Sequence, residues 1–166
     1  VFAFGLSSAT AVMIGNRIGA GDLELTREYA RRFSRLAVIA GLVFGLLLAA
    51  VAPYLLNIFN VSPAVRNDTL IILYTVALIF FVRVYNIIII VGVLRGGGDA
   101  RSAFLLEGFT MWFIGVPLTI IGAFVLKLPV YLVYGLSLFE EMAKALLCLW
   151  RYRSGRWMRN VTGNFR

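Results

Sequence analysis

The sequence predicts an all-α fold, a polytopic bundle of membrane-spanning helices, and two observations carry that prediction. Apolar residues make up 61% of the 166 residues and charged residues only 14%, with a mean hydropathy of +0.89, which is more apolar surface than a soluble domain of this length can bury. The charges also interrupt long apolar runs instead of lining one face. Runs of roughly 20 apolar residues are long enough to cross ~30 Å of hydrocarbon.

Five apolar segments are expected to span the membrane. The first is apolar from residue 1, with neither an initiator Met nor the basic start of a signal peptide, so we expect a span cut part-way along. The other four are long enough to be complete helices. The expected spans cover residues 1–18, 36–59, 70–94, 104–126 and 130–150, which together form one transmembrane bundle over residues 1–150.

The first two spans are separated by the charged stretch DLELTREYARRFSR, residues 22–35. Its glutamates and arginines recur at i,i+3 and i,i+4 spacing, which suits a charged helix with ion pairs along its surface. We expect this segment to be a separate interfacial helix on the cytoplasmic side. A solvated extension of the following span is the alternative that the same pattern allows.

The distribution of Lys and Arg predicts which ends of the spans face the cytoplasm. Twelve arginines lie at the end of the first span, in the breaks after the first and third spans and in the tail, whereas the other two breaks contain only Arg66 and Lys127. Cytoplasmic loops hold the excess of positive charge. The C-terminus and the basic tail over residues 151–166 are therefore expected in the cytoplasm of a multi-pass plasma-membrane protein. The tail follows a span directly, which favours contact with anionic lipid headgroups over nucleic acid.

The stretch VLRGGGDARS separates the third and fourth spans. It matches neither the phosphate-binding pattern G-x-x-x-x-G-K-[ST] nor G-x-G-x-x-G between a strand and a helix. Glycine commonly ends a helix, and aspartate commonly caps the next one. We therefore expect a cytoplasmic hairpin, with Asp99 as an N-cap, formed by Arg95, Gly96, Gly97, Gly98 and Asp99.

Four charged residues lie near the middle of the expected spans, where charge is costly and usually marks a functional site. Arg83 is about halfway along the third span, and Glu140, Glu141 and Lys144 are near the middle of the fifth. Glu140 and Lys144 are i,i+4 and can pair on one helix face. Glu141 points about 100° away, which leaves it for Arg83 or for a ligand, although pairing of Arg83 with Glu140 stays open.

Two interpretations of these charges are open. They can form an ion-pair brace between two helices, or they can place a proton- or cation-binding carboxylate in a water-filled cavity. In the second case the candidates to line the cavity are Tyr85, Asn86 and Trp112.

Small residues and one proline predict how the helices pack. Ala37, Gly41, Gly45 and Ala49 recur four apart in the second span, a pattern that lets another helix approach closely. Pro117 interrupts the fourth span and lacks the N–H that a regular helix needs, which predicts a kink.

The residue types that most enzymes and metal sites need are scarce. The chain has one cysteine, Cys148, and no histidine, which excludes a disulfide framework and a Cys/His metal cluster within these residues. A Ser/His/Asp set is impossible without histidine. We therefore expect no catalytic residues, no bound metal and no organic cofactor, and the protein is not expected to be an enzyme.

Four motifs in order along the chain resemble the MATE (multidrug and toxic compound extrusion) family. They are GNRIGAGD, VGVLRGGGDARSAFL, MWFIGVPLTIIGAFVLKLP and EEMAKALLCLWRYRSGRWMRNVT. The resemblance implies twelve helices in two six-helix lobes, and this chain would hold the end of helix 8 through helix 12 in the C-terminal lobe. It also implies export of cationic or amphipathic compounds by H⁺ or Na⁺ antiport through alternating access, with the remaining N-terminal part of the same transporter as a partner.

One departure from the family pattern leaves the coupling ion open. Some members place a cation-binding acid in the middle of the third span of this fragment, where this chain has Arg83, Val84, Tyr85 and Asn86. Two other functions stay open on the sequence alone. One is a lipid-linked oligosaccharide flippase, in which intramembrane cations such as Arg83 would face an anionic pyrophosphate. The other is a non-transporting membrane subunit braced by an ion pair.

Overall fold

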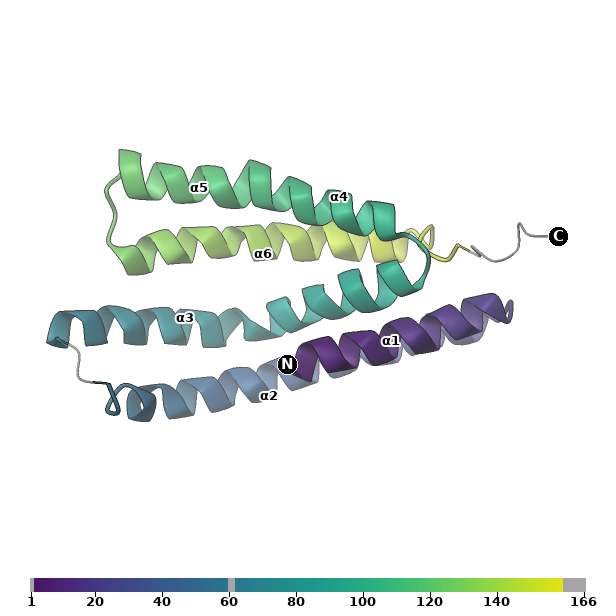
Figure 1. The fold of residues 1–166 in the computed structure, drawn as a ribbon, viewed down its shortest axis with the longest axis horizontal. Helices are drawn as coiled ribbons and strands as arrows, with labels where there is room; N and C mark the ends of the chain where they lie inside the picture. Colours follow the sequence, from purple (N-terminus) through teal and green to yellow (C-terminus); the bar gives the residue numbers. More distant parts are fainter. Residues whose placement is uncertain (1, 60–61, 160–166) are drawn as a thin grey trace.

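The computed structural model describes residues 2–59 and 62–159, and every regular element within them is helical. The long helices that follow one another along the chain run antiparallel, which confirms the predicted bundle (Figure 1). The elements labelled η are π-helical, with backbone hydrogen bonds that reach five residues back instead of four. In chain order the elements are α1 (Phe2–Gly19), α2 (Leu23–Leu55), α3 (Pro63–Ile87), η1 (Ile88–Arg95), α4 (Ala100–Thr110), η2 (Met111–Gly115), α5 (Val116–Ile120), η3 (Ile121–Val125) and α6 (Val130–Arg153).

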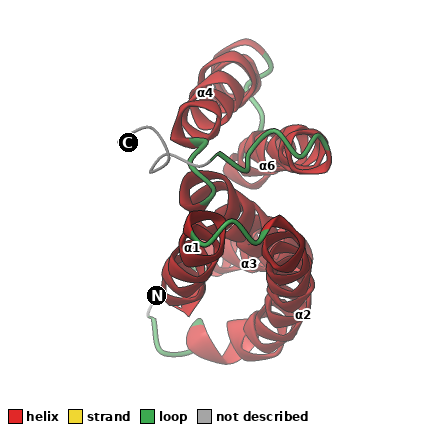
Figure 2. Ribbon diagram, turned by 90° about the vertical axis from the view of Figure 1, so that its right-hand side faces the viewer, coloured by secondary structure: helices red, strands yellow, loops and turns green. Residues whose placement is uncertain are grey.

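Seen end on, the helices form two groups (Figure 2). α1, α2 and α3 lie together, and the rod formed by α4, η2, α5 and η3 lies beside α6. α6 also packs against α3, and α1 packs against η1 and α2. The contact between α3 and α6 therefore connects the two groups.

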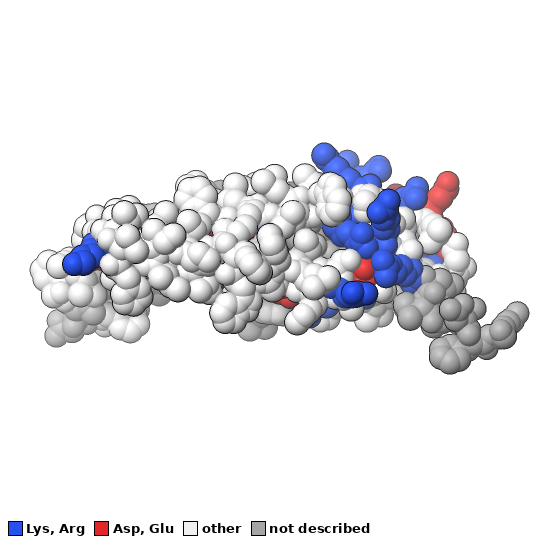
Figure 3. Space-filling view, turned by 90° about the horizontal axis from the view of Figure 1, so that it is seen from above, with Lys and Arg blue, Asp and Glu red and all other residues white. Residues whose placement is uncertain are grey.

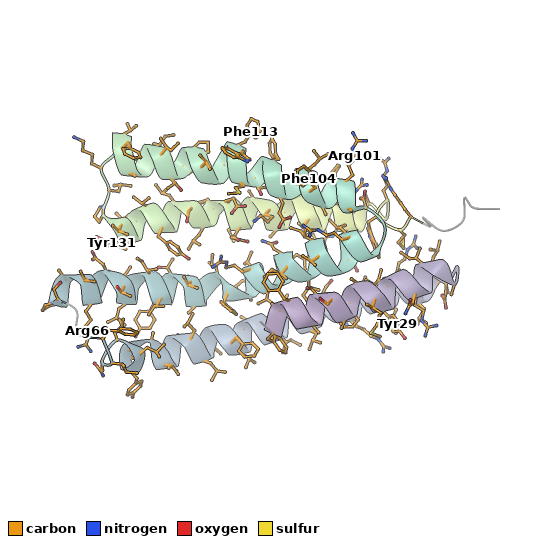
Figure 4. The ribbon with its side chains drawn as sticks, in the orientation of Figure 1. Tyr29, Arg66, Arg101, Phe104, Phe113 and Tyr131 are labelled. Carbon is orange, nitrogen blue, oxygen red and sulfur yellow. The ribbon has the colours of Figure 1, made fainter. Side chains whose placement is uncertain are left out.

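The two ends of the bundle differ in charge. The α1–α2 turn, the glycine loop between η1 and α4, and the end of α6 share one end, drawn on the right in Figure 1. Lys and Arg side chains gather at this end, which we call the basic end, and few lie at the opposite end (Figure 3). Arg101 lies at the basic end, whereas Arg66 lies at the other (Figure 4).

Not every expected span meets the same standard of length and composition. α1 and α6 fall outside the set of helices that are long and apolar enough to cross a membrane, in the part of the chain that the structure describes. α6 is less apolar because it contains three charged residues in its middle. Both helices nevertheless run beside the longer ones. The helices that meet the standard are Leu23–Leu55, Pro63–Arg95 and Ala100–Val125.

The separate interfacial helix expected over residues 22–35 does not form. α2 runs without a break from Leu23 to Leu55, so the charged stretch is a solvated extension of the second span. Asp22 caps this helix, and its side chain accepts a hydrogen bond of 3.0 Å from the Leu25 N–H. No glycine or proline separates the charged stretch from the apolar one, and helix formation is cooperative, so the helix continues.

α2 and α3 approach closely at the small residues of α2, as their four-residue spacing predicted. Gly41 packs directly on the backbone of Phe81. At Gly45 a Cβ would stand 2.6 Å from the carbonyl oxygen of Ala77. The missing side chains at these two glycines therefore permit the contact between α2 and α3.

A widened helical turn lies directly before Pro117. The Val116 N–H donates to the Met111 carbonyl, five residues back, and η2 and η3 flank the short α5 that contains Pro117. Proline has no N–H to donate, and its ring clashes with the preceding turn. π-helical turns therefore lie on both sides of Pro117, and the kink expected there stays a prediction.

Candidate functional site

The four charged residues near the middle of the spans meet between α3 and α6. Arg83 Nε lies 3.7 Å from Glu141 Oε1. Lys144 Nζ lies 2.6 Å from Glu140 Oε1 and 3.7 Å from Glu141 Oε1. The structure thus pairs Arg83 with Glu141, the choice that the sequence left open. We call this group of two cations and two carboxylates the charged cluster.

Two neutral side chains contact the glutamates of the charged cluster. Asn86 Nδ2 donates to Glu141 Oε2 at 2.8 Å and to the Glu141 backbone carbonyl at 2.9 Å. The Thr110 hydroxyl of α4 lies 3.0 Å from Glu140 Oε1. The sequence contains no signal for Thr110, because a threonine in a helix ordinarily bonds to its own backbone and no spacing rule connects residues 30 positions apart.

A cavity of about 330 Å³ opens beside the charged cluster, between α3, the η2–α5 segment and α6. Arg83, Glu140 and Glu141 form its charged side, Tyr134 adds a phenol, and most of the remaining wall is apolar. Gly115 lies in the wall and lets Glu140 pack closely against it, because a Cβ there would stand 3.2 Å from Glu140 Cγ. Cavities of this size and composition commonly bind small organic molecules.

Tyr85, a cavity-lining candidate from the sequence, does not line this cavity. It is two residues from Arg83, which is a rotation of about 200° around a helix. Its ring packs instead against the buried core that includes Ile14 and Trp157. The prediction for Tyr85 is wrong because a spacing of two residues along a helix places the side chains of Tyr85 and Arg83 on opposite faces of α3.

Asn86 and Trp112, the other two candidates, lie near the charged cluster without lining this cavity. Trp112 is 66% exposed and belongs to a separate groove of about 960 Å³ whose wall includes Glu140 and Lys144. Asn86 is 2% exposed and contacts Glu141 without lining the cavity. Its Oδ1 has no hydrogen-bond donor within the described residues, and a buried acceptor rarely stays unpaired.

Asp99 is the N-cap residue of α4, and its side chain forms a buried ion pair instead of a capping hydrogen bond. Its fully buried carboxylate accepts hydrogen bonds from Arg151 Nε at 2.7 Å and from the Ser102 hydroxyl at 2.9 Å, and Arg159 lies 3.6 Å away. Asp99 therefore occupies the N-cap position as predicted, but its side chain makes no capping hydrogen bond to α4. A guanidinium is the stronger partner for a buried carboxylate. The Asp99 carbonyl still accepts the first backbone hydrogen bond of the helix, from Ala103.

The glycines between η1 and α4 let the chain turn and let other segments approach. Gly98 has a φ of +85°, in the left-handed region that favours glycine. A Cβ on Gly96 would stand 2.6 Å from the α1 backbone, and one on Gly97 would stand 2.5 Å from Trp157 Cε3. The Arg159 N–H donates to the Gly97 carbonyl at 2.8 Å. The tail after α6 is thus folded onto the glycine loop, and we call this the tail–loop contact.

The two arginines that flank the glycine loop differ in their contacts. Arg95 pairs with Glu107 of α4 at 2.7 Å. Arg101 is exposed at the basic end (Figure 4). Residues 160–166 of the predicted tail lie outside the described residues, so the tail is described over residues 151–159.

Comparison with known proteins decides the family. The family model described as MatE matches residues 1–121, well over half of the chain. The chain belongs to the MatE family. The resemblance to this family is therefore confirmed.

The MatE chain is similar to three curated proteins, of which it spans about a third of the length or less. It is 31% identical to a probable multidrug resistance protein NorM of Xylella fastidiosa over 160 residues (90% of this chain, 32% of the relative). It is 27% identical to multidrug and toxin extrusion protein 1 of Pongo abelii over 128 residues (76% and 22%). It is 23% identical to an uncharacterized transporter, YisQ, of Bacillus subtilis over 158 residues (95% and 34%). No solved structure gives a significant match.

Proposed function

We propose that the MatE chain is part of a secondary active exporter that extrudes cationic or amphipathic compounds in exchange for H⁺ or Na⁺. The family match over residues 1–121 is the observation that carries this proposal. Two relatives are named for multidrug resistance or for multidrug and toxin extrusion, which supports export rather than catalysis. In the alternating-access mechanism two lobes rock around a central cavity that opens to one side of the membrane at a time. The rest of the transporter supplies the opposite wall.

The orientation that we propose places the basic end and the C-terminus in the cytoplasm, with the transporter in the plasma membrane. Arginines concentrate on the cytoplasmic side of multi-pass proteins. The uneven distribution of Lys and Arg in Figure 3 supports this orientation. The drug would then leave through the end that carries Arg66.

Glu141 is the carboxylate that we assign to ion coupling. It borders the cavity, its side chain is 15% exposed, and its contact with the 43% exposed Arg83 is long, at 3.7 Å. Asn86 donates a hydrogen bond to Glu141 through Nδ2, while its Oδ1 has no donor within the described residues. A proton or a cation in the cavity can therefore replace Arg83 as the partner of Glu141. Glu140 is a poorer candidate because Lys144 holds it at 2.6 Å.

Replacing Glu141 with Gln should abolish gradient-driven export, because an amide neither takes up a proton nor neutralises a cation. The measurement is export of a fluorescent cation by the full-length transporter in proteoliposomes with an imposed pH or Na⁺ gradient. The gradient that drives export identifies the coupling ion. Glu107→Gln is the matched control, since it removes the same charge from a surface pair with Arg95, and it should transport normally.

A structural brace is the competing interpretation, and charge exchange separates the two. If the pair only ties α3 to α6, well-expressed Glu141→Gln protein exports at the normal rate, and Glu141 is then not part of the mechanism. In that case the double variant Arg83→Glu with Glu141→Arg would restore the expression that Arg83→Glu or Glu141→Arg loses on its own. Under the coupling proposal the exchanged variant folds but stays inactive.

A further inference from the structure

A second cavity with charged walls lies at the basic end, apart from the charged cluster. Its volume is about 340 Å³, and it lies between the first turns of α2 and the tail after α6. Arg27 and Arg31, one turn apart on α2, line it together with Arg153 at the end of α6. Tyr152 and Trp157 supply aromatic surface to the same wall. We call it the basic cavity.

The three arginines of the basic cavity have no carboxylate partner within residues 2–59 and 62–159. Their neighbours differ, since Arg32 pairs with Glu28 and Arg151 pairs with Asp99. Arg27 and Arg31 also line an adjoining groove on α2. Its carboxylates are those of Asp22, Glu24 and Glu28, and among the described residues none of them forms an ion pair with either arginine, since Glu28 pairs with Arg32. Guanidinium groups that converge without a carboxylate favour an anionic ligand.

The tail–loop contact holds the wall of the basic cavity in place. Trp157 Nε1 donates to the Tyr152 carbonyl at 3.0 Å, and the two rings stack with centroids 6.0 Å apart. Trp157 is 1% exposed and packs on Gly97. Burial raises the pKa of the Tyr152 phenol, although Arg31 acts in the opposite direction. The phenol therefore stays protonated at neutral pH and can donate a hydrogen bond to an anion.

The basic cavity lies just beyond the apolar parts of two helices, at the start of one and at the end of the other. Arg31 precedes the apolar run of α2 that starts at Leu36, and Arg153 follows the apolar part of α6 that ends at Trp150. The polar headgroups of a bilayer lie at this level, just outside the hydrocarbon. Lipid headgroups are therefore the anions that this cavity meets at the highest local concentration.

We propose that the basic cavity binds the phosphate of an anionic phospholipid headgroup, with Arg27, Arg31 and Arg153 as its charged ligands. Guanidinium groups bind phosphate oxygens through charge-assisted and often bidentate hydrogen bonds. A zwitterionic lipid presents the same phosphate beside a cation, which three arginines disfavour. The bound lipid bridges α2 and the end of α6, two elements from the two groups of helices.

Native mass spectrometry of the full-length transporter in detergent tests this proposal, with added phosphatidylglycerol, phosphatidylcholine or inorganic phosphate. We expect wild-type protein to retain phosphatidylglycerol in preference to the other two. The double variant Arg31→Gln with Arg153→Gln should weaken that binding on the order of ten-fold, because each arginine near the surface attracts anionic lipid. Both side chains are exposed, so the variant should keep its melting temperature in the absence of lipid.

The matched control removes two charges from the same elements outside the cavity. Arg35→Gln with Arg156→Gln alters one exposed arginine on α2 and one in the tail, and it should bind phosphatidylglycerol as the wild type does. An equal loss in both double variants would overturn the site and leave only diffuse attraction to the basic end. Binding of inorganic phosphate at the same arginines, without preference for phosphatidylglycerol, would overturn the lipid as ligand and assign the cavity to a soluble phosphate compound.

Discussion

Replacing Asp99 with alanine should destabilise the transporter by roughly 3–5 kcal/mol, the cost of removing one partner from a buried ion pair. The Asp99 side chain is fully buried and that of Arg151 is 12% exposed, so the substitution leaves a guanidinium without a counterion where little water reaches it. The Ser102 hydroxyl also loses its acceptor. Because folded proteins are stable by only about 5–15 kcal/mol, much of the variant should fail to reach the folded state.

The melting temperature and the yield of monodisperse full-length transporter measure this effect. Asp22→Ala is the matched control, because it removes an aspartate from the same end of the bundle but from an exposed N-cap, where the loss is typically about 1 kcal/mol. Equal melting temperatures for the two variants would contradict the prediction. They would mean that Arg151 is hydrated and that its contact with Asp99 contributes no more than a surface ion pair.

Alanine at Gly41 should force α2 away from α3. The added Cβ would overlap the Cα of Phe81, and the Phe81 backbone nitrogen also lies against it. No change of rotamer moves backbone atoms, so the two helices must separate. Overpacking of this kind costs roughly 1–3 kcal/mol and occasionally more, and we expect the upper end. Thermal unfolding of the purified full-length transporter measures the loss.

Gly108→Ala is the control for the Gly41 variant. A Cβ at Gly108 meets nothing within 4 Å, and alanine favours the helix by about 1 kcal/mol over glycine, so this change should be neutral or stabilising. If the Gly41→Ala and Gly108→Ala variants instead have the same melting temperature, the close approach of α2 to α3 does not occur in the folded transporter.

Local patterns predicted the features that depend on neighbouring residues. The apolar runs predicted the long helices, and the four-residue spacing of Gly41 and Gly45 predicted the close packing of α2 on α3. The depth of Arg83 and Glu141 within their spans brought both to the same level, and the structure places them 3.7 Å apart. The depth of a residue in the membrane follows from counting residues along its helix, so the contact between Arg83 and Glu141 could be predicted from the sequence.

The sequence did not predict features that depend on distant residues or on a choice between two local signals. Arg151 is 52 positions from Asp99, whereas a capping rule considers only the residues of the next turn. The charged stretch of α2 suited an interfacial helix and a continued helix equally, and the continued helix forms because no breaker intervenes. Thr110 contacts Glu140 only because α4 and α6 lie side by side.

The π-helical elements make two of the long helices tolerant of changes in length. A π-helical turn holds about one residue more than an α-helical turn, so a residue can be gained or lost there while the hydrogen bonds of both flanking segments persist. The run Ile87–Ile90 spans the start of η1, and loss of any one of its four isoleucines produces the same sequence. Length variation, ordinarily confined to loops, can therefore enter these helices, and it would rotate everything beyond that point about the helix axis.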